Sequence, residues 1–348
     1  MKFIHIADIH LGVKPDRNKP WGKEREKHSW QAFQEVIDRV EEEKIQLLLI
    51  AGDLFHRQPL LRELREVDKQ FSRILDTKVV LIAGERDYLN PNSYYGMFPW
   101  KENVYFFHKE KMDYIELENL QTRIYGLSYH HREIFGYLYE NIKVKEDGYS
   151  NILLAHGGDE KHIPFKTNEL KKSVFDYVAF GHIHKPMQLV QDKVVMAGAL
   201  QPISCNEIGE HGYFIGEIES HICHVEFQPI NYCEYIPINL KVNKEITGEA
   251  LREFVTEQIK KAPSYQFFKI TLTGDCDADT STEDEALEQL DRVAQVLNFC
   301  QPDYNFEKLK LQYEHQVIGQ YINALEKMPQ DEITKKALYY GVEAMMAK

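Results

Sequence analysis

Five short polar motifs, each directly after an apolar run, constrain this chain of 348 residues more than any other feature. The apolar runs lie at residues 3–7, 47–51, 79–83, 152–155 and 177–180, and their length is typical of buried strands. The motifs that follow them are Asp8-Ile9-His10, Gly52-Asp53, Gly84-Glu85-Arg86-Asp87, His156-Gly157 and Gly181-His182-Ile183-His184. Because open α/β sheets build their sites at the ends of strands, this order predicts that Asp and His side chains meet at one edge of a sheet.

The joint pattern carries more information than any single motif. An Asp-x-His triplet is common by chance, and a lone His near a strand end is more often structural. Five motifs in order, each supplying carboxylate or imidazole groups, predict a site for two divalent metal ions. Mixed carboxylate and imidazole ligands suit manganese, iron, zinc or nickel better than calcium.

The composition favours a folded protein in a reducing compartment. Hydrophobic residues make up 43% of the chain and charged residues 28%, which argues against disorder. The net charge is −13, so any contact with DNA needs a local basic patch. The five cysteines show no CxxC spacing, and the sequence begins without a signal peptide or a long apolar run. We therefore expect a cytoplasmic protein that makes no membrane contact.

The order of predicted elements divides the chain into three parts. Residues 1–230 alternate strands with amphipathic helices at 24–44 and 61–76, and the later short strands would form a second sheet. This predicts an α/β fold in which two packed sheets have helices outside them. A small α/β cap domain over residues 235–314 and a helical tail over residues 315–348 would follow.

The cap domain and the tail are predicted from shorter patterns. Strand, helix, strand, helix and strand are expected at residues 234–242, 248–261, 266–273, 283–297 and 306–313. The acidic run at 275–279 faintly resembles a calcium loop, but it lacks the required Gly and Glu, so we interpret it as a solvated loop. The tail contains two helical patterns around Pro329, which either cover the chain's own core or dock a partner.

The motifs resemble those of the calcineurin-like metallophosphoesterase superfamily over residues 1–230, and within it the SbcD-type DNA-repair nucleases. The stretches that carry this resemblance are His5-Ile6-Ala7-Asp8-Ile9-His10-Leu11-Gly12, Leu49-Ile50-Ala51-Gly52-Asp53-Leu54-Phe55-His56, Gly181-His182-Ile183-His184-Lys185-Pro186 and Glu207-Ile208-Gly209-Glu210-His211-Gly212-Tyr213. The Ser/Thr phosphatase branch has Gly-Asp-x-x-Asp-Arg-Gly, which this chain lacks after Asp53. The resemblance implies a two-sheet sandwich and a metal-dependent phosphodiesterase, most simply a DNA exo- or endonuclease.

The resemblance also implies which side chains hold metal. The first ion would be bound by Asp8, His10 and His184. The second ion would be bound by His156, His182 and, where the family has Asn, Glu85, while Asp53 would bridge both ions. Two such cations can clamp a phosphate and activate a bound water. The SbcD resemblance favours manganese as the metal.

The third motif departs from the family. Glu85 keeps an oxygen donor but adds negative charge, so it either ligates the metal or turns away to pair with Arg86. Arg86 replaces a family His that is thought to protonate the leaving group, and a guanidinium cannot do this near neutral pH. It can instead hold a phosphate. His56 or a water would then supply the proton, and Asp87, which normally orients that His, would pair with Arg86.

Three functions therefore remain open. The first is a DNA nuclease that works with an SbcC-like coiled-coil ATPase and, by resemblance, forms a homodimer through the two helices near the N-terminus. The second is a phosphodiesterase for nucleotides or other small phosphodiesters. The third is a metal- and DNA-binding subunit with little activity.

Residues 14–27 contain six basic and three acidic side chains, and this loop either steers phosphates or is simply solvated.

Overall fold

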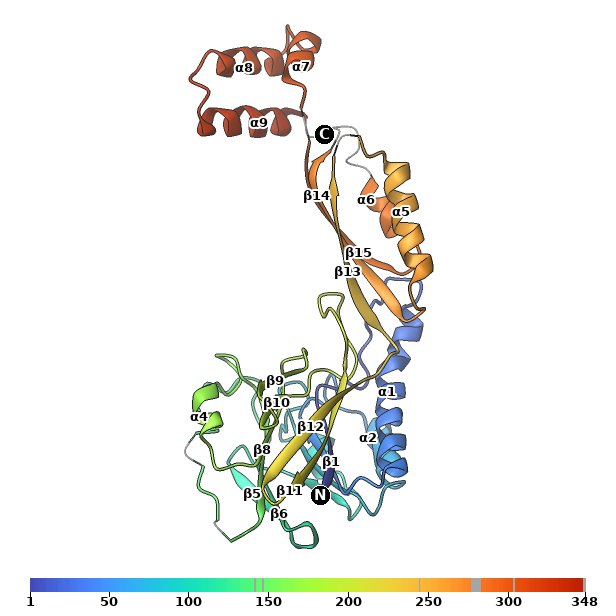
Figure 1. Cartoon of the computed structure of the whole chain (residues 1–348), viewed down its shortest axis with the longest axis vertical. Helices are drawn as coiled ribbons and strands as arrows, with labels where there is room; N and C mark the ends of the chain where they lie inside the picture. The colour runs from blue at the N-terminus through green and yellow to red at the C-terminus, as the bar shows by residue number, and fades with distance from the viewer. Residues whose placement is uncertain (141, 146, 244, 277–282, 303, 347–348) are drawn as a thin grey trace. The chain divides into compact units, whose positions relative to one another are not determined.

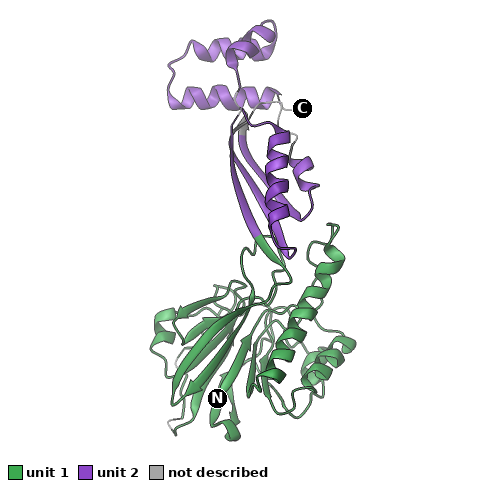
Figure 2. Cartoon of the chain, turned by 45° about the vertical axis from the view of Figure 1, so that its right-hand side comes forward, with its two compact units in different colours: residues 1–235 green, residues 236–348 purple. Residues whose placement is uncertain are grey.

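A computed structural model describes residues 1–348 with the exception of residues 141, 146, 244, 277–282, 303 and 347–348. The chain divides into two compact units, Met1–Tyr235 and Ile236–Lys348 (Figure 2). Part of the acidic run at 275–279 lies outside the described residues. Within the described part of the chain, none of the helices has the length and apolar character needed to cross a membrane.

The first unit contains two six-stranded sheets among its described residues (Figure 1). The first sheet has the order β12-β11-β1-β2-β3-β4, formed by β12 (Ile222–Pro229), β11 (Gly212–Glu219), β1 (Lys2–Ile6), β2 (Leu47–Ala51), β3 (Lys78–Ile82) and β4 (Val104–Phe106). The second has the order β5-β6-β7-β8-β10-β9, formed by β5 (Asp113–Leu117), β6 (Thr122–Gly126), β7 (Ser150–His156), β8 (Tyr177–Gly181), β10 (Val194–Met196) and β9 (Met187–Val190). Strands β1 to β4 pair in parallel, as do β6 to β8, so their carboxyl ends share an edge.

Strand β2 shows why its sequence is apolar at every position. Leu47, Leu49 and Ala51 face the core between the two sheets. Leu48 and Ile50 face the opposite way, into the core that the first sheet shares with α1 (Gly22–Glu42) and α2 (Leu61–Phe71). A strand buried on both faces loses the alternation of polar and apolar residues. The predicted two-sheet α/β sandwich with outer helices is confirmed.

The assignment of strands to sheets differs from the prediction at both edges of the first sheet. Strands β4, β11 and β12 belong to the first sheet and not to the second. Strand β11 pairs antiparallel with β1, and β12 returns from it through a hairpin. The two turn residues, Ser220 and His221, both have positive φ angles, of 49° and 67°. This is the backbone of a tight two-residue hairpin, and it needs no Gly-rich signal in the sequence.

The first unit also contains the short helices α3 (Tyr94–Met97) and α4 (Thr167–Lys171) and the turn η1 (Glu118–Leu120).

The second unit begins with a three-stranded sheet, order β13-β14-β15, among the described residues. Its elements are β13 (Glu234–Val242), α5 (Gly248–Lys261), β14 (Gln266–Cys276), α6 (Glu283–Glu288) and β15 (Val293–Pro302). The helix predicted over 283–297 is therefore too long, because its second half pairs in parallel with β14 as a strand. The strand predicted over 306–313 is wrong: this segment is helix α7 (Phe306–Gln312), which Asn305 caps by accepting a hydrogen bond from the Lys308 amide.

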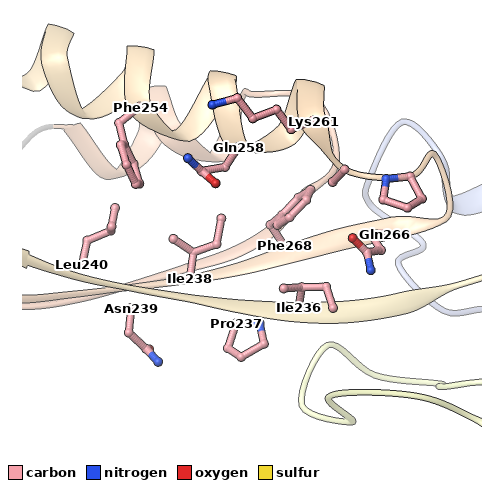
Figure 3. Close-up of a pocket in the computed structure, with 12 residues that line it drawn as sticks. Ile236, Pro237, Ile238, Asn239, Leu240, Phe254, Gln258, Lys261, Gln266 and Phe268 are labelled. Carbon is pink, nitrogen blue, oxygen red and sulfur yellow. The ribbon is translucent and has the colours of Figure 1, made fainter.

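An open groove of about 540 Å³ lies between α5 and β13 in this unit (Figure 3). Phe254 of α5 and Ile238, Leu240 and Phe268 of the sheet give it apolar walls (Figure 3).

The tail helices α8 (Val317–Glu326) and α9 (Glu332–Met346) pack together with α7 around a small core of their own. That core contains Ile318, Ile322, Leu338 and Val342. Each of the two tail helices thus buries one apolar face in this core.

Candidate metal centre

The predicted ligands come together where five strands end. Asp8 and His10 follow β1, Asp53 follows β2, Glu85 follows β3, and His156 ends β7, while His182 and His184 follow β8. Three overlapping groups form there, in each of which the possible ligand atoms lie within 4.8 Å of one another. They are Asp8 with His10 and His184, Asp8 with Asp53 and His156, and Glu85 with His156 and His182. Two of these groups contain the residues that the resemblance assigns to the first and second ions, and their role as ligands stays a prediction.

The backbone at these strand ends is strained. Asp8, His10 and Asp53 have φ angles of 48°, 49° and 48°, and His182 has 93°. Non-glycine residues seldom adopt such angles, and they persist where the surrounding structure holds them for function. Gly84 is required for a different reason: a Cβ atom there would overlap the Asp53 carboxylate and crowd the His156 ring. The strand ends therefore hold the ligand side chains close to one another and to the chain.

The first half of the centre consists of Asp8, His10 and His184. The Nε2 atoms of His10 and His184 lie 3.0 Å apart. The Nδ1 atom of His184 lies 2.9 Å from Glu207 Oε1, to which it can donate, leaving the Nε2 lone pair free to bind a cation. Burial lowers the pKa of His10 well below its ordinary value, which keeps this imidazole neutral and able to act as a ligand.

The second half consists of Glu85, His156 and His182. The Glu85 Oε2 atom lies 2.5 Å from His156 Nε2 and 3.3 Å from His182 Nδ1. The carboxylate therefore points into the centre. On the far side, His156 Nδ1 donates to the Ala51 carbonyl oxygen at 2.7 Å, and His182 Nε2 lies 2.8 Å from Asp159 Oδ2. Burial alone would lower the pKa of His182, but hydrogen bonds with Glu85 and Asp159 outweigh it and raise the pKa to about 9.

The side chains present fit a pair of divalent cations. Three fully buried polar atoms, Asp8 Oδ1, His10 Nδ1 and Asp53 Oδ2, have no hydrogen-bond partner. Burial, together with the negative charges of Glu85, Asp87 and Asp8, raises the pKa of Asp53 well above its ordinary value. Unpaired buried carboxylates are costly, and divalent cations would supply the missing partners and the opposite charge. The mixture of carboxylate and imidazole groups suits transition metals.

The three residues predicted to act in catalysis lie in different environments. The Arg86 side chain is 41% exposed, and its Nε lies 3.7 Å from Glu85 Oε1. The Asp87 carboxylate is buried and accepts hydrogen bonds from the Phe55 and Gly84 amides at 3.1 and 2.8 Å. Its partners are thus backbone amides, which differs from the expected ion pair with Arg86. Burial raises the pKa of Asp87 to about 7.

His56 lies against the first half of the centre. Its ring centroid is 5.3 Å from that of His10, and its buried Nδ1 has no hydrogen-bond partner. Burial, followed by the positive charge of Arg86, lowers its pKa. A neutral imidazole is a poor proton donor near pH 7, so this environment works against His56 as a replacement for the family's general acid.

Two side chains outside the predicted set orient the ligands. Glu207 belongs to a stretch that resembles the family, yet sequence gave no reason to link it with His184. Asp159 follows His156 by three residues, and together with His162 it forms a further ligand-type group with His182. A carboxylate placed behind a ligating imidazole fixes both its ring orientation and its tautomer. The signal for Asp159 was its sequence proximity to His156, and the signal for Glu207 was its place in a family-like stretch; each is weak evidence alone.

The basic loop at residues 14–27 is partly structural. Arg25 is 1% exposed, pairs with Asp16 at 3.3 Å and donates to the Pro202 carbonyl oxygen. The Trp21 indole also donates to Asp16, at 3.0 Å. Arg25 is therefore unable to contact a phosphate, whereas Arg17 and Lys23 are exposed. The exposed basic surface of this loop is therefore smaller than the sequence count indicates.

Comparison with known proteins agrees with this geometry. Residues 1–186 match the family model described as calcineurin-like phosphoesterase. The chain is similar to the uncharacterised metallophosphoesterase YhaO of Bacillus subtilis (strain 168), with 26% identity over 317 residues that cover 83% of this chain and 77% of that protein.

Two archaeal relatives carry a more specific name. The DNA double-strand break repair protein Mre11 of Methanocaldococcus jannaschii is 26% identical over 285 residues, which cover 76% of this chain and 75% of that protein. The protein of the same name from Sulfolobus acidocaldarius is 24% identical over 283 residues, or 75% of this chain and 72% of that protein. Since the family model spans more than half of the chain and the strand-end motifs converge on one centre, the chain belongs to the calcineurin-like phosphoesterase family of metal-dependent hydrolases.

Proposed function

We propose that this protein is a manganese-dependent DNA nuclease of the SbcD type. The observation that carries the proposal is the placement of two ligand sets side by side around Asp53, at one edge of the two sheets. The similarity to two proteins named as DNA double-strand break repair proteins supports DNA as the substrate over a small phosphodiester. Carboxylate and imidazole ligands in this mixture are compatible with manganese.

The chain's own residues account for substrate binding in this proposal. Divalent cations held by the two ligand sets would supply an activated water and neutralise phosphate charge. Arg86 lies at the rim of the centre with 41% of its side chain exposed, so its guanidinium is placed to hold a non-bridging phosphate oxygen. The Arg86 backbone amide donates to Asp53 Oδ1 at 2.9 Å. This hydrogen bond holds Arg86 next to the residue that would bridge both ions.

Leaving-group protonation is the step for which the described residues around the centre offer no evident side chain. Arg86 stays protonated near neutral pH, and the low pKa of His56 keeps that ring neutral. Asp87 is occupied by two backbone amides. Water is then the proton source for the departing oxygen. Loss of general acid catalysis costs ~10²–10⁴ in rate, so we expect a slow but genuine enzyme.

The proposal is tested by incubating the full-length protein with labelled duplex and single-stranded DNA in manganese buffer. We expect cleavage that a chelator stops and that Asp53→Asn abolishes. Hydrolysis of small phosphodiesters without DNA cleavage would instead support the second candidate. DNA and metal binding without any hydrolysis would support a subunit that lacks activity.

An SbcC-like coiled-coil ATPase is the partner we infer for the tail. Among the described residues of the tail (315–348), four apolar side chains remain more than half exposed although the tail helices have a core of their own: Val317, Met328, Ile333 and Tyr340. A helical pair with such a surface suits docking on another helix. Co-purification with the ATPase, lost in Val317→Glu/Ile333→Glu, would support this partner. Homodimerisation through α1 and α2 stays a prediction, which the molar mass in solution measures.

A further inference from the structure

A second carboxylate–histidine group lies beside the centre and uses one of its ligands. Asp159 Oδ2 is 2.8 Å from His182 Nε2, and Asp159 Oδ1 is 2.8 Å from His162 Nδ1. The rings of His162 and His182 are 4.5 Å apart between centroids. The three possible ligand atoms lie within 4.8 Å of one another. Side-chain exposure falls from 47% at Asp159 to 17% at His162 and 11% at His182, so the group is reached from solvent.

The loop that presents this group is built against its intrinsic preferences. Gly157 and Gly158 have φ angles of 134° and 131°, and Ile163 has 40°. A positive φ at a β-branched residue is an outlier that the surrounding structure must enforce. Here the Gly158 amide donates to the His162 carbonyl oxygen, and the Ile163 amide donates to that of Ile134. Strain of this kind concentrates at functional sites.

We propose that Asp159, His162 and His182 form an outer position for a divalent transition metal, of the zinc or cobalt class. Two imidazoles and one carboxylate, with coordination positions open to water, are ligands that suit these ions. The proposal concerns metal binding alone and does not depend on the protein cleaving DNA.

His182 links the outer position to the second half of the centre. A neutral imidazole has one lone pair, so it can bind one ion while its other nitrogen donates a proton. An ion bound at Nδ1, beside Glu85, leaves Nε2 to donate to Asp159. An ion bound at Nε2, beside Asp159, leaves Nδ1 to donate to Glu85. In either case a carboxylate supports the ligating ring. Because neutral His182 can bind only one ion, an ion in the outer position and an ion bound by His182 in the second half of the centre exclude each other.

Binding at the outer position can be counted separately once the second half of the centre has lost a ligand. The apo form of the full-length His156→Gln variant keeps the first half of the centre and the outer group. We expect it to bind two equivalents of Co²⁺, counted by the visible absorption of the bound ion, whereas His156→Gln/His162→Gln binds one. His131 is an exposed histidine that pairs with Glu110 at 2.9 Å, so His156→Gln/His131→Gln is the matched control and should still bind two.

Two results would overturn the proposal. One is uptake of a single equivalent by His156→Gln, and the other is uptake of two by His156→Gln/His162→Gln. Either would leave Asp159 as a residue that only orients His182. If His156→Gln fails to fold, the same Co²⁺ counts are made in a Glu85→Ala background, which removes another ligand of the second half: two equivalents that fall to one with His162→Gln support the outer position, and any other pair of counts rejects it.

Discussion

The two halves of the metal centre lie next to each other and share Asp53, yet their side chains make different contacts. In the first half, Asp8 Oδ1 and His10 Nδ1 have no hydrogen-bond partner, while His184 has the Glu207 carboxylate behind it. In the second half, Glu85 already contacts both imidazoles, and His182 has a further carboxylate behind it. Each half therefore has a carboxylate behind one of its imidazoles, and the second half differs because Glu85, where the family has Asn, already contacts both of its imidazoles.

In our proposal, the centre keeps its cations while its chemistry differs from that of the family. Glu85 and Arg86 occupy consecutive positions after β3, and one faces the centre while the other faces solvent. The substituted motif thus adds charge to the second half and removes a proton donor from the rim. Both changes act on the turnover step and leave the ligand geometry of the first half intact.

The largest expected effect tests the first half. Replacement of His184 by Gln removes an imidazole from the buried set and should reduce manganese-dependent phosphodiesterase activity by ~10³, since such centres need both cations to stabilise the attacking and leaving oxygens. Glu85→Gln, its counterpart in the second half, keeps an oxygen donor and should change the rate by less than ~10-fold. Rates of chromogenic phosphodiester hydrolysis measure both. Equal losses in the two variants would break the comparison between the halves.

The next effect is an increase in rate. Arg86→His restores an imidazole at the rim, and general acid catalysis contributes ~10²–10⁴, so we expect the turnover of DNA or of an alkyl phosphodiester to rise about 100-fold. Arg86→Gln serves as the control, because it removes the guanidinium without supplying a proton donor. A rise in both variants would show that Arg86 hinders the reaction by its charge or size.

A smaller effect concerns metal affinity. Glu207→Gln replaces the carboxylate that orients His184 by a neutral group and should weaken the first cation by ~10-fold, as is usual when such a supporting residue is lost. Calorimetric titration with manganese measures this. Asp176→Asn, which alters a carboxylate paired with the exposed His221, should leave the affinity unchanged. An unaltered affinity in Glu207→Gln would mean that packing alone orients His184.

The smallest effect tests the proton source. If water protonates the leaving group, His56→Gln should lower kcat by no more than ~3-fold, because the neutral ring has little proton to give near pH 7. The pH dependence of kcat in wild type and variant measures this contribution. A loss of two orders of magnitude, with the disappearance of an acid-side limb, would assign the proton transfer to His56.

The sequence predicted the sandwich and the convergence of the motif side chains because both follow from one local rule. A run that is apolar at every position, such as 47–51, forms a strand buried on both faces, and the polar residue after it has to lie at the sheet edge. This rule does not predict the hydrogen-bond partners of the side chains in and around the centre. Asp87 binds the Phe55 and Gly84 amides, and Glu207 reaches His184 from 23 residues away. Such contacts depend on how loops cross above the sheet, which no periodic pattern records.

Errors in the second unit have a similar origin. Residues 293–297 continue the helical spacing of the segment before them, and pairing with β14 makes them part of a strand. The sequence predicts a strand over residues 306–313, although Asn305 provides a helix cap. In both cases short segments had ambiguous patterns, and tertiary contacts or one capping side chain decided the outcome.

The central claim is that the protein keeps its metal centre but lacks a side chain that protonates the leaving group. The dependence of the manganese-supported rate on the pKa of the leaving alcohol, measured over a series of phosphodiesters, tests it most directly. Wild type should slow steeply as the leaving group becomes more basic, and Arg86→His should show a much shallower slope. A shallow slope in wild type, equal to that of Arg86→His, would contradict the claim.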